Sequence, residues 1–358
     1  MELAVREVAP KNRKPRQKDE SKLGFGRLFT DHMFEMDYHP DKGWHDPRIV
    51  PHHPLSLDPA SMVLHYGQEA FEGLKAYRGK DDGVYLFRHR DNLKRMNNSC
   101  KRLVMPELPI DFISDCLKKL VLLDRDWIPT STGCALYIRP NIIATDPFLG
   151  VRPSSTYLYY IILGPVGAYY PEGFNPVSIY VSDKYVRAVV GGVGDAKTAG
   201  NYAAGLLAQK EAKDKGFTQV LWLDAIERKY IEEVGTMNIF FKFGDEVVTS
   251  PLTGSILPGV TRDSVIQVLG KWGVKCTERN YSIGEVIAGL KDGHVTEVFG
   301  SGTAAIISPV KSIQYKGQDY QVGDGKTGPL SQKLYDYILS LQYGQQEDTF
   351  GWTERIDL

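Results

Sequence analysis

Cysteine is scarce in this sequence and is not arranged for cross-linking. The chain has four cysteines among 358 residues, with no C-x-x-C pair: Cys100, Cys116, Cys134 and Cys276. This spacing predicts neither a disulfide scaffold nor a structural zinc site, and it favours a reducing compartment. The adjacent His52 and His53 stand between prolines, which favours a loop over a metal site.

Long apolar runs are missing as well. The most apolar stretch, YLYYIILGPVGAYY (157–170), is interrupted by glycine and proline and is too short to cross a bilayer. No apolar segment of the secretory type follows the N-terminus. The first residues are basic, as in an organelle transit peptide, but they include acidic residues that such a peptide avoids: Glu2, Glu7, Asp19 and Glu20. We therefore expect a cytoplasmic protein rather than a mitochondrial one.

Neither sign of charge is in excess. The chain has 43 lysines and arginines against 44 aspartates and glutamates, for a formal net charge of −1. Such a balance argues against a nucleic acid or an acidic membrane as the main partner.

What is present is an ordinary globular composition, with 42% hydrophobic and 24% charged residues, long enough for about two domains. Between residues 61 and 160, short β-rich runs alternate with helical patterns such as DNLKRMNNSCKRL (91–103). We predict an α+β fold divided as follows: a flexible arm over 1–22, a small domain over 23–163, a Gly- and Pro-rich linker over 164–177, and a large domain over 178–358.

The large domain begins with closely spaced runs rich in β-branched and aromatic residues, among them SIYVSD, RAVV (187–190), QVLWLD, YIEEV and NIFFKF. Parallel neighbours need longer crossovers than this spacing allows, so we expect antiparallel pairing. Helical patterns over 201–216 and 261–273 interrupt the runs. The large domain is therefore predicted to be a sheet or barrel with flanking helices.

The stretch GGVGDAKTAGNY (191–202) has two interpretations. It approaches the phosphate-binding pattern G-x-x-x-x-G-K-[ST], with Gly191, Lys197 and Thr198 in place. However, Ala196 replaces the glycine before the lysine, and its Cβ obstructs the backbone that must wrap a phosphate. In the second interpretation, a flexible loop delivers the Lys197 amine to a carbonyl group, as in covalent catalysis.

Other segments supply what a lysine bound to pyridoxal phosphate requires. That cofactor needs an acid opposite its pyridine nitrogen, which EEVGTMN offers as Glu233. It also needs a phosphate cup. LPGVTR leads into a helix whose first amides belong to Val260 and Thr261, FGSGTAA offers Thr303, and Arg88 or Arg90 ends a strand.

Together these segments resemble one family, the branched-chain amino-acid aminotransferases of the fold-type IV pyridoxal-phosphate enzymes. The likeness runs from FGRLFTDHM (25–33) almost to the C-terminus, through LHYGQEAFEGLKAYRG, LYIRP, GGVGDAKTAGNYAAGLLAQ, QVLWLD, EVGTMNIFF, ILPGVTRDSV and EVFGSGTAAIISPV. Eight fragments in order, with matching spacing, make the resemblance specific.

The resemblance implies reversible amino transfer between L-leucine, L-isoleucine or L-valine and 2-oxoglutarate. Lys197 would form the Schiff base with pyridoxal 5'-phosphate and carry the proton. The other cofactor contacts implied are Tyr202 on the ring oxygen, Glu233 on the pyridine nitrogen, Leu257 on the ring, and Arg88, Val260, Thr261 and Thr303 on the phosphate.

The same resemblance implies a homodimer and a set of substrate contacts. Thr236 and Ala304 would meet the substrate carboxylate, Arg139 would meet the distal carboxylate of the second substrate, and Tyr66 would come from the partner subunit. The apolar side-chain pocket would consist of Phe25, Phe71, Tyr137 and Val151, the last again from the partner. From the residues alone, Phe71 and Tyr137 also fit core packing, and Arg139 fits a surface strand end.

One motif departs from the family. Eukaryotic members carry a C-x-x-C pair after GSGTA, whereas this chain has Ala305 and Ser308 at those positions. A thiol switch is therefore not expected, although the sequence otherwise resembles the eukaryotic-type subgroup, which also has bacterial members. Two other activities remain open within the same fold, D-amino-acid aminotransferase and aminodeoxychorismate lyase, and a P-loop-like NTPase remains open outside it.

Overall fold

The computed structural model describes residues 1–167 and 174–357. By their internal contacts these residues form two units, each described here by itself. Unit 1 contains Met1–Tyr169, Ala196–Ala199 and Ser340–Leu358, and unit 2 contains Tyr170–Asp195 and Gly200–Leu339, apart from the undescribed residues within these ranges. The short Ala196–Ala199 segment, which carries Lys197, thus groups with unit 1.

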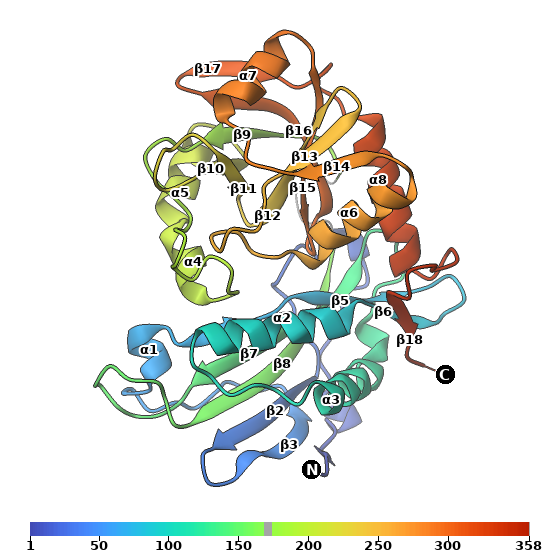
Figure 1. The fold of residues 1–358 in the computed structure, drawn as a ribbon. Helices are drawn as coiled ribbons and strands as arrows, with labels where there is room; N and C mark the ends of the chain where they lie inside the picture. Colours follow the sequence, from blue (N-terminus) through green and yellow to red (C-terminus); the bar gives the residue numbers. More distant parts are fainter. Residues whose placement is uncertain (168–173, 358) are drawn as a thin grey trace. The chain divides into compact units, whose positions relative to one another are not determined.

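Unit 1 is built on a mixed sheet in the order β1-β3-β2-β8-β7-β5-β6-β18, with β4 paired to β7 (Figure 1). Its strands are β1 (Ala4–Val5), β2 (His32–His39), β3 (Gly43–Pro51), β4 (Glu69–Phe71), β5 (Leu74–Arg78), β6 (Val84–Phe87), β7 (Ala135–Ala144), β8 (Tyr157–Val166) and β18 (Thr353–Arg355). Its helices are α1 (Met62–Tyr66), α2 (His89–Arg102) and α3 (Ile110–Leu123), with 3-10 turns η1 (Pro10–Asn12), η2 (Glu20–Lys22) and η3 (Arg125–Trp127).

Helices α2 and α3 pack side by side against this sheet (Figure 1). Their apolar residues recur at helical spacing, so that Leu93 and Met96 of α2 and Leu117 and Leu120 of α3 are fully buried in one core with the sheet. The expected helix over 91–103 and the strand patterns of this region are confirmed.

The N-terminal 22 residues have described contacts in unit 1. Ala4 and Val5 pair in parallel with Arg48 and Ile49 of β3, and the Val8 N–H donates to His32 Nε2 at 2.9 Å. The mobility expected for this arm stays a prediction. The expected linker over 164–177 lies partly outside the described residues, because 168–173 are not described.

Unit 2 contains a sheet that closes on itself. The strand order is β11-β10-β9-β16-β15-β12-β13-β14, and an additional β11–β12 pairing joins the first strand to the sixth, as expected of a barrel. The strands are β9 (Val177–Val181), β10 (Gln219–Leu223), β11 (Ile231–Val234), β12 (Met237–Phe243), β13 (Glu246–Thr249), β14 (Lys275–Glu278), β15 (Val295–Gly302), β16 (Ile306–Tyr315) and β17 (Gln318–Gln321).

The helices that accompany this barrel are α4 (Ala199–Ala204), α5 (Leu206–Asp214), α6 (Val260–Lys271), α7 (Ile283–Lys291) and α8 (Pro329–Gln342), the last ending in unit 1. Of these, α5 packs against β10, α6 against β14 and β15, and α7 against β15 and β17 (Figure 1). The start of α7 shows why a helix begins there: the Ser282 side chain accepts from the Glu285 N–H at 3.0 Å, which satisfies an N–H group with no partner inside the helix.

Three local predictions for this region are wrong. RAVV (187–190) is not a strand: its arginine side chain turns to a buried glutamate, and its valines 189 and 190 are 48% and 60% exposed. β9 and β10 pair in parallel, because α4 and α5 provide the crossover between them. The helix expected over 201–216 is divided in two at Gly205.

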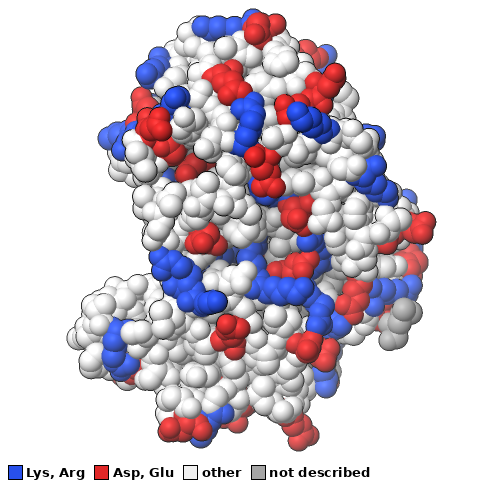
Figure 2. Space-filling view, in the orientation of Figure 1, with Lys and Arg blue, Asp and Glu red and all other residues white. Residues whose placement is uncertain are grey.

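Positive and negative side chains are interspersed on the face of each unit drawn in Figure 2. In the described part of the chain, no helix is long and apolar enough to cross a membrane. Within residues 1–167 and 174–357, no group of three or more His, Cys, Asp or Glu side chains is placed to hold a metal ion.

Candidate active site

Lys197 is fixed in unit 1 through its backbone. Its N–H donates to the Ser99 hydroxyl of α2 at 2.9 Å, and its carbonyl accepts from the Phe71 N–H at 3.0 Å. The next residue, Thr198, donates its hydroxyl to the Glu69 carbonyl at 2.7 Å. The segment that carries the lysine therefore runs along β4 and α2.

The side chain of Lys197 lies against an aromatic surface. Its amine is 4.8 Å from the centroid of the Phe71 ring, and the Arg139 guanidinium carbon is also 4.8 Å from that centroid. Arg139 donates to the Tyr137 hydroxyl at 3.0 Å, and Phe25 packs edge-on against Tyr137 with centroids 5.0 Å apart. Unit 1 thus brings together five of the residues predicted from the sequence, and two of them are cations beside apolar rings.

Gly73 explains why Tyr137 can lie where it does. A Cβ atom at this position would collide with the Tyr137 hydroxyl. The glycine of FEGLKAY is therefore required by the close approach of a ring, not by an unusual backbone angle.

Beneath the lysine segment lies a buried charge network that the sequence did not indicate. Glu72 is completely buried and accepts from Arg95 Nε at 2.7 Å, from Arg95 Nη2 at 2.9 Å, and from Asn92 at 2.9 Å. Burial by itself would raise the pKa of Glu72, but the charges of Arg95 and Lys197 and these hydrogen bonds hold that pKa below its ordinary value. Glu72 therefore stays ionised, with Lys197 in its electrostatic field.

Arg88 occupies the N-cap position of α2 in a left-handed conformation, with φ 50° and ψ 29°. Its Nε donates to Asp91 at 2.8 Å, and its guanidinium lies over the Trp352 ring, 4.9 Å from the centroid. The alternative arginine, Arg90, instead pairs with Asp111 at the exposed surface. Of the two arginines, Arg88 has the more defined side-chain orientation, which favours Arg88 over Arg90 as the candidate for the phosphate.

Tyr66 and Val151 lie on a different part of unit 1. Tyr66 ends α1 and donates its hydroxyl to the Leu149 carbonyl, and its residue is 43% exposed. Val151 is 85% exposed. Their neighbours Leu64, Phe148 and Leu149 are exposed as well, so the two predicted residues belong to an apolar surface.

In unit 2, Glu233 of β11 is held among polar partners. The residue is 2% exposed, and its carboxylate accepts from Arg187 Nε, from Asn238 Nδ2 at 2.9 Å and from the Leu257 N–H at 3.3 Å. Arg187 also donates to the carbonyls of Ser255 and Gly194 at 2.7 and 3.1 Å. The acid predicted for the pyridine nitrogen is thus a carboxylate beside a buried arginine.

Arg187 and Asn238 were not identified from the sequence. Asn238 stands in the EVGTMN segment next to Glu233 in the β11–β12 register, so the hairpin spacing could have revealed it. Arg187 had no such signal, because it lies 46 positions before Glu233 in a segment expected to be a strand. The adjacent Glu232 behaves differently: burial raises its pKa, and the Ser255 hydroxyl donates to it at 2.5 Å.

The remaining predicted residues of unit 2 lie at helix starts and turns. Val260 and Thr261 are the first two residues of α6, which has no side-chain cap at Gly259, and Leu257 precedes them and is buried. Tyr202 is in α4, Thr236 is in the turn between β11 and β12, and Thr303 and Ala304 are in the turn between β15 and β16. Amide groups at a helix start are suited to an anion.

Comparisons with known proteins identify the family of this chain. The model of the amino-transferase class IV family matches residues 69–313. The branched-chain-amino-acid aminotransferase 2 of Bacillus subtilis (strain 168) is 55% identical over 352 residues, which is 98% of this chain and 97% of that protein.

Solved structures are similar at lower identity. The Escherichia coli branched-chain amino acid aminotransferase has a TM-score of 0.76 and 29% identity, covering 91% of this chain and 99% of that one. The branched-chain aminotransferase of the thermophilic archaeon Thermoproteus uzoniensis, solved with norvaline, has a TM-score of 0.76 and 25% identity, covering 91% and 99%. With a family model over most of the chain and a relative at 55% identity along nearly all of it, the chain belongs to the branched-chain-amino-acid aminotransferases of the amino-transferase class IV family.

Proposed function

We propose that this chain is an aminotransferase that moves the amino group of L-leucine, L-isoleucine or L-valine to 2-oxoglutarate, reversibly, with pyridoxal 5'-phosphate on Lys197. The observation that carries the proposal is the position of the Lys197 amine against Phe71, whose ring also meets the Arg139 guanidinium. An amine, an apolar wall and a carboxylate-binding cation are what this reaction requires of its protein. Family membership favours this interpretation of the glycine loop over the phosphate-binding one.

The residues present fit the cofactor. A buried carboxylate beside an arginine, at Glu233, suits a protonated ring nitrogen, and the N-terminus of α6 suits a phosphate. When bound, pyridoxal phosphate supplies an electron sink for the charge that develops at the substrate Cα.

Residues of the chain itself bind the cofactor and transfer the proton. Lys197 holds the cofactor and moves the Cα proton as base and then acid. We assign Tyr202 to the ring oxygen, Glu233 to the ring nitrogen and Leu257 to the ring face. The phosphate is assigned to Arg88, Val260, Thr261 and Thr303.

For the substrates, we assign Thr236 and the turn at Ala304 to the carboxylate at Cα. Phe25, Phe71 and Tyr137 exclude water from the branched side chain, because their rings offer no hydrogen-bonding atoms except the Tyr137 hydroxyl, which Arg139 occupies. Arg139 itself would bind the distal carboxylate of 2-oxoglutarate. The same pocket must accept both an apolar and an anionic side chain, and Arg139 stacked on rings serves both.

We further propose a homodimer in which Tyr66 and Val151 complete the partner's pocket. The support is the exposed apolar surface around them, with Leu149 at 61% and Val151 at 85% exposure. Val151→Asp should shift the protein toward monomer in sedimentation, whereas Ile226→Asp, at an 84% exposed position of unit 2, should not. A cytoplasmic location is proposed with it.

The activity is tested by comparing amino donors with 2-oxoglutarate as acceptor. L-leucine, L-isoleucine and L-valine should be turned over, and D-alanine and aminodeoxychorismate should not. Faster turnover of D-alanine or of aminodeoxychorismate would contradict the proposal. Arg139→Leu tests the binding of the distal carboxylate separately. This variant should raise KM for 2-oxoglutarate at least about tenfold and change KM for L-leucine much less.

A further inference from the structure

The C-terminal segment of the chain returns to the start of α2 and contacts Arg88 twice. The Arg88 N–H donates to the Trp352 carbonyl at 2.7 Å, and the Trp352 ring lies under the Arg88 guanidinium at 4.9 Å. One residue, more than 260 positions away in sequence, therefore touches both the backbone and the side chain of Arg88. Both residues belong to unit 1.

These contacts matter because Arg88 has an uncommon backbone conformation. A positive φ is unfavourable for a residue with a Cβ, and it persists only where the surroundings hold it. The hydrogen bond from its N–H fixes the backbone, Asp91 takes the Nε edge of the guanidinium, and the indole covers one face. An edge and a face together define the plane of the guanidinium, whose side chain is only 10% exposed.

Trp352 is itself held firmly. Asp348 accepts from the N–H groups of Phe350, Trp352 and Thr353 at 3.0, 2.5 and 2.6 Å. The Phe350 ring stacks on the indole with centroids 4.0 Å apart, and the Phe87 ring meets it edge-on at 5.7 Å. The indole is thus packed between rings and is 9% exposed.

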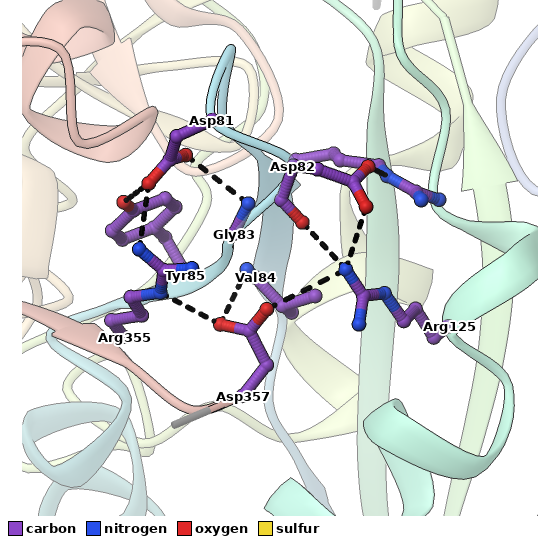
Figure 3. Close-up of polar contacts among 9 residues, drawn as sticks. Asp81, Asp82, Gly83, Val84, Tyr85, Arg125, Arg355 and Asp357 are labelled. Atoms are coloured by element: carbon purple, nitrogen blue, oxygen red, sulfur yellow. Dashed lines mark hydrogen bonds and ion pairs between the residues drawn. The ribbon is translucent and has the colours of Figure 1, made fainter.

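The strand that follows Trp352 is anchored by ion pairs (Figure 3). β18 pairs with β6, and Arg355 binds Asp81 at 2.7 Å and Asp357 at 3.0 Å. Asp357 accepts from the Val84 N–H at 3.1 Å and lies 3.5 Å from Arg125, which also pairs with Asp82. β6 is the strand that ends just before Arg88, so this network secures the chain on both sides of the contact.

We propose that Trp352, held by the docked C-terminal segment Asp348–Asp357, is a positioning residue that orients the Arg88 guanidinium for the phosphate of the cofactor. This inference rests on the proposed function, which assigns Arg88 to that phosphate. Trp352 acts only through Arg88: its loss weakens the binding of the phosphate group and leaves the binding of the pyridine ring unchanged.

The test compares two probes on the cofactor-free full-length protein. Pyridoxal phosphate and pyridoxal differ only in the phosphate, so the Kd of pyridoxal divided by the Kd of pyridoxal phosphate gives a ratio that isolates the phosphate contribution. Trp352→Leu should reduce this ratio about tenfold, and Trp352→Phe, which keeps an aromatic face, should restore most of it. Inorganic phosphate should compete correspondingly less well for pyridoxal phosphate binding to Trp352→Leu.

The matched control is Trp127→Leu, the same substitution at a residue of unit 1 that is 6% exposed and bonded to Asp31. Its ratio should equal that of the wild type. An unchanged ratio in Trp352→Leu, or an equal fall in Trp127→Leu, would overturn the proposal. If Trp352→Leu does not fold, the cycle of Arg88→Lys and Trp352→Met, which also removes the aromatic face, decides: coupled effects on the ratio support the proposal, and additive effects overturn it.

Failure of the proposed function and failure of the role given to Trp352 would give different results. A wild-type protein without Lys197-dependent binding of pyridoxal phosphate would defeat the proposed function, and this inference with it. A wild type that binds pyridoxal phosphate better than pyridoxal, together with a Trp352→Leu variant of the same ratio, would defeat only the role of Trp352.

Discussion

Each unit contains a buried glutamate paired with an arginine whose side chain is 9% exposed, and the two pairs are built differently. In unit 1, Glu72 meets Arg95 through two guanidinium nitrogens, and a second donor, Asn92, comes from the same helix, α2. In unit 2, Glu233 meets Arg187 through Nε, and the terminal nitrogens of that arginine donate to backbone carbonyls. The first pair depends on one helix, and the second is tied to several segments of the barrel unit.

The difference indicates two roles. Glu72 binds Arg95 through both carboxylate oxygens and so fixes α2, which in turn holds the backbone of Lys197 through Ser99. Arg187 keeps two neutral acceptors even without its glutamate, so the carboxylate of Glu233 serves chemistry more than folding. Removal of each carboxylate should therefore have a different main effect, on stability in unit 1 and on rate in unit 2.

The largest effect expected is that of Glu72→Gln on folding. The amide cannot accept from both Arg95 nitrogens, which leaves a buried charge without its partner and should lower the free energy of unfolding by about 3–5 kcal/mol. Urea unfolding measures it. Glu107→Gln, at an exposed position of unit 1, is the control and should match the wild type. A Glu72→Gln variant as stable as the wild type would remove the contrast between the two pairs.

The next effect concerns the rate. Glu233→Gln keeps the hydrogen bond from Asn238 but loses the charge that we assign to the cofactor nitrogen, so single-turnover rates with L-leucine should fall about 10²- to 10³-fold. Glu232→Gln on the same strand is the control. Because neighbouring side chains point to opposite faces of a strand and Glu232 is hydrogen-bonded by Ser255, this variant should change the rate less than about threefold. Equal rate losses in both variants would contradict the role given to Glu233.

A smaller effect should follow from Gly73→Ala in unit 1. The added Cβ collides with the Tyr137 hydroxyl, and the resulting overpacking should cost about 1–3 kcal/mol. Displacement of Tyr137 also disturbs Arg139 and Phe25, so KM for both substrates should rise while the absorbance of bound cofactor is retained. Gly270→Ala, whose Cβ would meet no atom within 4 Å, should leave KM unchanged. An unaltered KM in Gly73→Ala would show that the ring is not held as described.

The smallest effect is a dependence on acid pH in unit 1, which contains seven of the eight histidines. Burial lowers the pKa of His89 from 6.5 to about 4, so between these values the unfolded chain binds a proton that the folded chain does not. Stability is therefore lost as the pH falls through this range, on the order of 1 kcal/mol at about pH 5.5.

Urea unfolding of the wild type and of His89→Asn at about pH 7 and about pH 5.5 measures this contribution. The variant should lose less stability on acidification. Hydrogen exchange should show the loss first in α2, while β11 and β12 keep their protection. Equal pH dependence in both proteins would contradict the assignment to His89.

Local features of the sequence were sufficient to predict α2, α6, most strands and the turns that carry the cofactor assignments. Each depends on periodicity, a helix start or a glycine within a few residues. Contacts between distant segments were not predictable. Arg187 lies far from Glu233 in sequence, Arg95 and Glu72 look like surface charges on a helix and in a loop, and β18 is only three residues long.

The wrong predictions for RAVV and for the β9–β10 pairing also result from contacts between distant segments. RAVV has the composition of a strand, but the burial of the Arg187 side chain outweighs the β-propensity of its valines. The parallel pairing of β9 and β10 follows from α4 and α5 as a crossover, although the spacing of the neighbouring strands suggested hairpins. Both the conformation of RAVV and the pairing of β9 with β10 depend on tertiary contacts, which a local sequence pattern does not reveal.

The central claim is that Lys197, and no other lysine, carries the cofactor. Borohydride reduction of the protein loaded with pyridoxal phosphate, followed by peptide mass mapping, tests it directly. The account predicts a phosphopyridoxyl group on Lys197 and none on Lys75, the buried lysine of unit 1 whose pKa is lowered by burial to about 8. A label on Lys75 or on any other lysine, or a protein that carries no label, would contradict it.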